Sequence, residues 1–400
     1  MRIPFKYTKD LVIVTEHFSP STGATAQLVT DLADDLHARG VNICILTSTC
    51  GQAEKPYRIV RLSTGVRATS GILLKAYLGT LFILRVTLWL STKLNKQSSL
   101  LLVSNPPFLG LVGPFIRIVK NVKYVFLLQD LFPKSACLSG LLPGRGPLVF
   151  LWRRLISLVI NLSSTTIVLS EDMRNRCLTE YQPTKNIKTI PNWAVFNPCK
   201  IDKSDSKLFS DWNIQNTLTL QYSGNFGRLH DILTILEAAR LLVHYPVSIY
   251  FVGGGAKLEY IKHYIQKYHL KNVVVKPYQP RNMLPHSLAA CDISLVSLIN
   301  GAEDAVAPSK FYGIIASSRP VILISNPRSE LSRLITSWNC GLVVSPGDVE
   351  QLVREITSLI SNPSKLSTMS TNSGTLYKTK FGRENSTRQY YQLFMQLGFL

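Results

Sequence analysis

Negative charge is scarce in this chain of 400 residues. Asp and Glu total 24 against 44 Lys and Arg, which gives a formal net charge of +20. A surplus of this size calls for an anionic partner, and three kinds qualify: nucleic acid, an anionic membrane surface or a phosphorylated substrate. Net charge alone does not choose among them.

Paired cysteines are also lacking. The chain has seven scattered cysteines, an odd number without the short paired spacing of zinc sites. We interpret them as free thiols in a reducing compartment. The first ten residues, MRIPFKYTKD, contain no apolar signal-peptide core, so secretion is not expected.

No long hydrophobic run is free of charge. The longest, residues 72–90, contains Lys75 and Arg85, which favours a buried or interfacial helix over a transmembrane span. The stretch from Arg145 to Arg154 places basic residues beside apolar ones such as Trp152. This pattern suits a helix that lies on a membrane, and a solvated helix with its apolar side in the core explains it equally well.

Apolar strand-like runs alternate with helical periods along the whole chain, which predicts parallel sheets covered by helices. LVIVTE reads as a strand, and a helical period follows from Leu28 to Leu36 until Gly40 ends it. The polar stretch 196–216 looks like a connection, after which LTLQYSG and VSIYFVGGG begin a similar half. We therefore predict an α/β fold of two Rossmann-like domains whose parallel sheets face an interdomain cleft. The predicted domains are 1–195, with a C-terminal helix at 380–400 packing back on it, and 196–379.

Ligands of open parallel sheets bind beyond the carboxyl ends of the strands, so residues that follow strands are the candidates for function. Gly23 lies between the first strand and its helix, where a missing side chain allows close approach to the backbone. Gly253 and Gly254 end a later strand in the same way. Ordinary turn glycines explain all three equally well.

The turn after the first strand of the second half is more informative. It carries Asn225, Gly227 and Arg228, and the arginine is placed to stabilise an anion. A surface arginine beside a tight turn is the alternative.

The segment Ala307-Pro308-Ser309-Lys310-Phe311-Tyr312 reads as a helix start, and Glu303 precedes it in the same loop. Free amide groups joined by Lys310 would bind an anion, whereas a plain helix cap would need no lysine. Asp130 follows another apolar strand, where its carboxylate can bind a hydroxyl group or cap a helix.

Together these residues resemble glycosyltransferase family 4, of the GT-B fold, and in particular the subgroup of bacterial surface polysaccharide synthesis. The resemblance covers nearly the whole chain. It rests on TEHFSPSTGATAQLVTDLADDLHARG, LQDLFPKSACLSGLL, IVLSEDM, IPNW, YSGNFGRLHD, VGGG, APSKFYGIIASSRPVILI and GLVVSPGD.

The resemblance implies that Arg228 and Lys310 hold the diphosphate of a nucleotide-sugar and that Asp130 acts on the acceptor side. Donor-binding positions are expected at Gly23, Asn225, Gly227, Gly253, Gly254, Glu303, Ser309 and Phe311. Members of the family typically retain anomeric configuration and need no metal, so no cofactor or metal site is expected here.

Two positions depart from the family pattern. Gly313 stands where a glutamate usually holds the ribose, and the partner glutamate aligns near Ala305, with Glu303 as a neighbour. A lysine that often follows the glycine-arginine turn is missing, and His230 with Asp231 occupies the turn's exit. Lys310 is our candidate for the missing charge.

The resulting prediction is a metal-independent, retaining glycosyltransferase that acts on a lipid-linked or saccharide acceptor in cell-surface polysaccharide synthesis. We expect it in the cytoplasm, peripheral on the inner face of the plasma membrane, with an anionic membrane surface and no nucleic acid as partner. One rival is a nucleotide-sugar epimerase of the same fold, which would convert donor without acceptor. The others are a basic nucleic-acid-binding protein, for which no clear stacking motif is present, and a dehydrogenase, for which the first strand lacks G-x-G-x-x-G.

Overall fold

The computed structural model describes residues 10–62, 71–184, 186–212, 214 and 217–400. Two compact units divide the chain. Unit 1 comprises Met1–Pro191, Ala305–Ala307 and Arg383–Leu400, and unit 2 comprises Asn192–Asp304 and Pro308–Gly382.

Unit 1 is built on a seven-stranded sheet in the order β3-β2-β1-β4-β5-β6-β7, and all neighbouring strands are parallel. Its strands are β1 (Leu11–Thr15), β2 (Ile43–Thr47), β3 (Arg58–Arg61), β4 (Ser99–Val103), β5 (Tyr124–Leu127), β6 (Thr165–Val168) and β7 (Ile187–Thr189). Its helices are α1 (Ala24–Ala38), α2 (Ile72–Lys93), η1 (Leu109–Leu111), α3 (Val112–Lys120), α4 (Lys134–Leu138), α5 (Pro147–Leu162), α6 (Glu171–Tyr181) and α15 (Arg383–Gln396).

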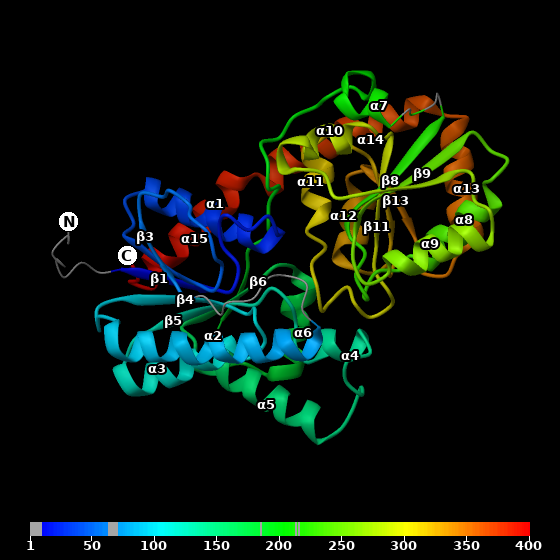
Figure 1. The fold of residues 1–400 in the computed structure, drawn as a ribbon. Coiled ribbons are helices and arrows are strands. Elements are labelled where there is room, and N and C mark those ends of the chain that lie inside the picture. Colours follow the sequence, from blue (N-terminus) through cyan, green and yellow to red (C-terminus); the bar gives the residue numbers. More distant parts are fainter. Residues whose placement is uncertain (1–9, 63–70, 185, 213, 215–216) are drawn as a thin grey trace. The chain divides into compact units, whose positions relative to one another are not determined.

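Helices cover both faces of this sheet. Helices α1 and α15 lie on one face, and α2, α3 and α5 lie on the other (Figure 1). The C-terminal helix is fastened to α1 by Arg383, which forms ion pairs with Asp31 (3.0 Å) and Asp35 (2.6 Å). Helix α1 follows the predicted helical period and ends before Gly40, whose φ of 84° suits a residue without a side chain.

Unit 2 repeats this design with a six-stranded parallel sheet in the order β10-β9-β8-β11-β12-β13. Its strands are β8 (Leu218–Asn225), β9 (Val247–Gly254), β10 (Val273–Lys276), β11 (Ile293–Ser297), β12 (Val321–Ile324) and β13 (Gly341–Val344). Its helices are η2 (Lys203–Asp205), α7 (Lys207–Asp211), α8 (Leu233–Leu241), α9 (Leu258–Lys267), η3 (Arg281–Met283), α10 (Leu284–Ala289), α11 (Lys310–Ala316), α12 (Glu330–Ser337), α13 (Val349–Ile360), α14 (Pro363–Leu376) and the π-helical η4 (Tyr377–Phe381).

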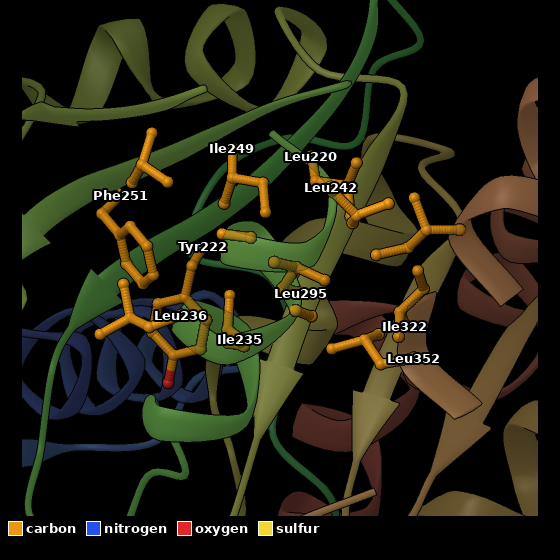
Figure 2. Close-up of a cluster of buried hydrophobic side chains, with 14 of the residues drawn as sticks. Leu220, Tyr222, Ile235, Leu236, Leu242, Ile249, Phe251, Leu295, Ile322 and Leu352 are labelled. Atoms are coloured by element: carbon orange, nitrogen blue, oxygen red, sulfur yellow. The ribbon is translucent and has the colours of Figure 1, made fainter. Parts of the chain in front are cut away.

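The core of unit 2 follows the two-residue period of its strands. Ile322 and Ile324 of β12 face α8, α9 and α13 in one buried cluster (Figure 2). Val321 and Leu323, the alternate residues, face α11, α12 and α14 in a second cluster. Because both faces are covered, these strands read as continuous apolar runs in the sequence, which is why they were predictable.

In both sheets the chain reverses its strand order beside the first strand, between β1 and β4 in unit 1 and between β8 and β11 in unit 2. Such switch points are where open α/β sheets bind ligands. The predicted α/β architecture of two Rossmann-like sheets is therefore confirmed. Residues 196–216, predicted to be a plain connection, belong to unit 2, where their described part contains η2 and α7.

Candidate active site

The turn after β8 gathers positive charge in unit 2. Arg228 is exposed, and no carboxylate among the described residues lies within ion-pair distance of it. Lys257, at the start of α9, reaches the exit of the turn, where its Nζ donates to the carbonyl oxygen of His230 (2.6 Å). Lys310, from the first turn of α11, donates to the carbonyl oxygen of Asn225 (3.4 Å).

Lys310 occupies an unusual place for a cation. Its Nζ lies 3.7 Å from the ring centroid of Tyr222, a cation–π contact, on a side chain that is partly withdrawn from water. Burial lowers the pKa of Lys310 well below its usual range. An anion bound beside it would restore the charged form, because an opposite charge raises the pKa of a lysine.

His230 is neutral at physiological pH. Its Nδ1 accepts a hydrogen bond from the backbone N–H of Gly227 (3.0 Å), which places the ring proton on Nε2. Burial, followed by repulsion from Lys310, lowers the pKa of His230 to about 3. The histidine therefore shapes the turn without adding to its charge.

Asp231 lies at the end of the turn, just before α8. Its carboxylate caps α8 by accepting from the backbone N–H (3.2 Å) and the hydroxyl (2.5 Å) of Thr234. Both carboxylate oxygens of this buried residue therefore bind groups at the start of α8. The basic residues at this turn are Arg228, Lys257 and Lys310.

Glu303 lies in the loop that follows β11, next to β8 in the sheet. Its Oε1 accepts from the amide of Asn326, which follows β12 (3.1 Å). Its Oε2 is buried and has no hydrogen-bond partner among the described residues. A buried carboxylate oxygen without a partner is costly, and a ligand hydroxyl would satisfy it.

The glycines at the end of β9 have a structural explanation. Gly253 has a φ of 142°, and a Cβ there would collide with the carbonyl oxygen of Gly224 on the paired strand. A Cβ on Gly255 would meet the side chain of Asn225 in the same way. The carbonyl of Gly254 accepts from the backbone N–H of Phe226 (2.7 Å). The sheet itself therefore requires this glycine run, whatever else approaches it.

The start of α11 differs from the predicted anion site. The helix has only seven residues, Ser309 precedes it without a side-chain capping bond, and the N–H of Phe311 already donates to Pro308 (3.0 Å). Phe311 is fully buried and meets the rings of Tyr312 and Phe381 edge-on. Its predicted contact with a donor would require opening the core, so the structure gives this residue a packing role.

Gly313, the position of the expected ribose-binding glutamate, lies under an aromatic ring. A Cβ on Gly313 would stand 3.3 Å from Cε1 of Phe196. A larger residue at this position would require that ring to shift by a few tenths of an ångström.

The candidates of unit 1 lie at the carboxyl edge of its own sheet. Gly23 precedes α1, is exposed, and has open space where a Cβ would stand. The hydroxyl of Thr25 donates to Oε1 of Gln129 (3.0 Å), which ties the start of α1 to the end of β5 next to Asp130. Burial raises the pKa of Asp130 to about 6.

Sequence reasoning missed two residues at these edges. Lys257 follows the glycine run after β9 and supplies a cation where the expected lysine of the turn is missing. Glu16 ends the LVIVTE segment directly after β1, and burial raises its pKa. Both positions follow strands, a signal that was available in the sequence. Among the described residues, no three His, Cys, Asp or Glu side chains gather in a metal-binding cluster.

The family models match both units. A model described as Glycosyltransferase Family 4 matches residues 25–194, and one described as Glycosyl transferases group 1 matches residues 205–375. The chain therefore contains a glycosyltransferase family 4 domain followed by a glycosyl transferases group 1 domain. The two models include Asp130, the turn after β8, Glu303 and Lys310, whereas β1, Glu16 and Gly23 lie before the first matched residue.

Similar proteins give the same result. The chain is 27% identical over 274 residues, 68% of each chain, to "Probable glycosyltransferase WbjE" of Pseudomonas aeruginosa. It is 28% identical over 199 residues, 49% of each chain, to "Putative colanic acid biosynthesis glycosyl transferase WcaI" of Escherichia coli K12. Its fold is similar to that of Anabaena HepE, solved with UDP-glucose, with a TM-score of 0.71, 15% identity, and coverage of 97% of this chain and 100% of HepE.

The chain is thus a glycosyltransferase with the predicted GT-B fold. The rival interpretations as a nucleic-acid-binding protein or a dehydrogenase have no support in these comparisons.

Proposed function

We propose that the protein is a retaining, metal-independent glycosyltransferase that moves a sugar from a nucleoside diphosphate sugar to a lipid-linked or saccharide acceptor. We place this reaction in cell-surface polysaccharide synthesis, on the cytoplasmic side of the plasma membrane. WcaI is named for colanic acid biosynthesis and HepE was solved with UDP-glucose, which supports the pathway class and the donor class. Seven free cysteines suit a reducing compartment.

The observation that carries the proposal is the cationic turn after β8. Arg228 and Lys310 have no carboxylate partner among the described residues, and Lys257 stands at the turn's exit. In glycosyl transfer the bond between the anomeric carbon and the diphosphate oxygen breaks while a bond to the acceptor hydroxyl forms. Negative charge then grows on the leaving diphosphate, and cations fixed beside it lower the barrier.

The same groups support metal independence. Hard divalent cations prefer carboxylate and carbonyl oxygens, whereas this turn carries the basic side chains of Arg228, Lys257 and Lys310. The turn is suited to take over the charge-neutralising task of a metal ion. Activity should persist in EDTA. Complete loss of turnover in EDTA, with recovery on addition of Mg²⁺ or Mn²⁺, would contradict this part of the proposal.

The donor experiment compares two arginine variants of unit 2. Wild type, Arg228→Ala and Arg240→Ala are incubated with a panel of nucleotide-sugars and a membrane extract, and nucleotide release is measured. Arg240 is the matched control, because it lies near the end of α8, in an ion pair with Glu237 (3.0 Å). Arg228→Ala should lose about 10²-fold or more in turnover, the scale for removing one donor that stabilises transition-state charge. Equal activity of the two variants would refute the assignment.

Two readouts of the same experiment separate the remaining alternatives. An epimerase would convert the donor without extract, whereas a transferase releases nucleotide only when an acceptor is present. Retention is tested by the anomeric configuration of the product in its NMR spectrum. An inverted product would overturn the retaining assignment and leave the transferase assignment standing.

A lipid-linked acceptor is supported by an aromatic stack in unit 1. The ring of Trp152, on α5, lies between Phe108, after β4, and Phe132, after β5, with ring centroids 4.4 Å and 5.5 Å away. Phe132 follows Asp130 by two positions at the same sheet edge. Aromatic rings in such places suit ligands with an apolar part and a polar part. Trp152→Ala should raise KM for a lipid-linked acceptor and leave KM for the donor unchanged.

A further inference from the structure

Three helices of unit 1 carry apolar side chains both on the side that faces the sheet and on the side that faces solvent. Helices α2, α3 and α5 lie side by side over one face of the sheet (Figure 1). The inner side of α2 is fully buried through Phe82, Val86 and Leu90. Val112 and Ile116 of α3, and Val149, Ile156, Val159 and Ile160 of α5, are buried in the same way. These residues account for the core contacts of the three helices.

The outer side of these helices is also hydrophobic, although it faces solvent. Leu88 on α2 is 67% exposed, Ile118 on α3 is 77% exposed and Phe150 on α5 is 60% exposed. The exposed large apolar residues of this face, which we call the outer face, are Leu74, Tyr77, Leu84, Leu88, Phe115, Ile118, Val119, Leu148, Phe150, Leu151 and Leu158. Surface helices normally carry polar residues there, and an extended exposed apolar patch marks a binding surface.

Positive charge dominates the segments that carry the outer face. Between Lys55 and Ser170 the sequence has fifteen Lys and Arg residues and a single acidic residue, Asp130. Helices α2, α3 and α5 contain no Asp or Glu at all. Lys93, at the end of α2, and Arg145, before α5, are exposed, and Arg154 lies over the ring of Phe150 with its guanidinium carbon 5.1 Å from the ring centroid. Most of the net positive charge of the chain therefore belongs to this part of unit 1.

We propose that the outer face docks on an anionic lipid bilayer. The bilayer boundary offers an apolar layer for the exposed side chains and a negative surface for the basic residues around them. A second copy of the chain would bring the same positive charge against itself. Nucleic acid would leave the aliphatic residues of α2 and α3 without apolar contacts, because such sites combine basic grooves with base-stacking aromatics.

In this proposal α2 lies parallel to the bilayer surface. Among the described residues, the segment Leu74–Lys93 is the one stretch long and apolar enough, by length and composition, to cross a membrane. One side of this helix is nevertheless part of the core of unit 1, through Phe82, Val86 and Leu90. The helix therefore lies in the plane of the interface, with Tyr77, Leu84 and Leu88 toward the lipid.

The test is vesicle flotation of the full chain without any nucleotide-sugar, so that its result is independent of the proposed transfer reaction. Vesicles of phosphatidylcholine with phosphatidylglycerol are compared with phosphatidylcholine alone. Wild type should bind the anionic vesicles and bind the neutral ones at least tenfold more weakly. Replacing Lys93 and Arg145 by Gln should weaken binding by about fivefold per charge, on the scale of one surface charge near an anionic leaflet. The control that removes two exposed charges of unit 2, Lys271→Gln with Arg328→Gln, should have little effect.

The apolar contribution is tested with a second matched pair. Leu88→Glu with Ile118→Glu adds two carboxylates to the outer face, and Leu233→Glu with Leu241→Glu adds two to exposed positions of α8 in unit 2. All four side chains are exposed, so both variants should fold, which circular dichroism checks. The first variant should lose more than tenfold in vesicle binding relative to the second.

Three outcomes would overturn the docking assignment. Wild type that floats with neither vesicle has no lipid-binding face. Equal loss in the two glutamate variants would show that net charge alone governs binding. A wild-type dimer in light scattering that Leu88→Glu with Ile118→Glu converts to a monomer would show that a second copy covers the face. In each case the nucleotide-release assay still reports on the transferase separately.

Discussion

Lys310 is predicted to take up a proton when the donor binds. In the free protein its Nζ lies over the ring of Tyr222 at 3.7 Å and donates one long hydrogen bond, to Asn225 (3.4 Å), while burial lowers its pKa well below the usual range. A diphosphate beside the amine raises that pKa again. Between the two pKa values, binding therefore requires proton uptake, and affinity falls as pH rises, by at most about one decade per pH unit for a single group.

The magnitude follows from the contact that is lost. A hydrogen bond to a charged group contributes about 1.5–3 kcal/mol, so Lys310→Met should weaken diphosphate binding by roughly 10- to 150-fold. Coulomb attraction at about 4 Å and an effective dielectric of about 20 would give near 4 kcal/mol, which the cost of charging a buried amine reduces. The smaller range is therefore the expectation.

The assay is titration calorimetry with a panel of nucleoside diphosphates in buffers of different ionisation enthalpy, which reports affinity and proton uptake together. Lys267→Met is the matched control, because the Nζ of Lys267 lies over the ring of Tyr268 at 5.0 Å, on α9. Lys310→Met should lose both affinity and proton uptake, and Lys267→Met should keep both. If Lys310→Met binds and turns over like wild type, Lys310 does not hold the diphosphate.

Three further predictions concern other groups of the two units. Because the pKa of Asp130 is raised to about 6, its carboxylate forms as pH rises through that value, so kcat/KM should rise there. Asp130→Asn should lose this limb and about 10²–10⁴-fold in rate, and an unchanged pH profile would rule out its acceptor role. The pKa of His230 is about 3 in the folded protein against an ordinary value near 6.5, so the unfolded chain binds the extra proton as pH falls through this window. As pH falls through this window, wild type should lose up to about 1.4 kcal/mol of unfolding free energy per pH unit relative to His230→Gln. If urea unfolding gives both proteins the same change in unfolding free energy between pH 7 and pH 5, this prediction is wrong. Gly253→Ala should cost about 3 kcal/mol or more, because it combines a positive φ with a collision against backbone, whereas Gly23→Ala should stay within about 0.5 kcal/mol. Urea midpoints of the two variants measure the difference, and equal midpoints would show that the strand ends relax.

The fold was predictable because parallel strands covered on both faces leave uninterrupted apolar runs. LVIVTE and VSIYFVGGG became β1 and β9, and the helical period from Leu28 to Leu36 became part of α1. The position of each candidate after a strand was predictable for the same reason. Asn225 ends β8, Gly227 and Arg228 follow it in a turn, and Glu303 follows β11.

Side-chain direction was not predictable, because it depends on packing between segments far apart in the chain. Phe311 and Lys310 are neighbours in the sequence, yet one ring enters the core and the other side chain reaches the turn after β8. Lys257 meets that turn only because β9 pairs with β8. Gly253 looked like a position for a ligand, and the paired strand occupies the space where its Cβ would be.

The return of α15 to unit 1 has a consequence for synthesis of the chain. Arg383 pairs with Asp31 and Asp35, and Phe394 and Phe399 are buried there, so residues 383–400, which are made after unit 2, complete the unit that residues 10–191 begin. Domains generally fold in the order in which they leave the ribosome. Here unit 2 has its whole sequence available earlier, and residues 10–191 must wait with one flank of α1 uncovered. A nascent chain stalled before residue 383 should therefore expose α1 to proteases while unit 2 already resists them.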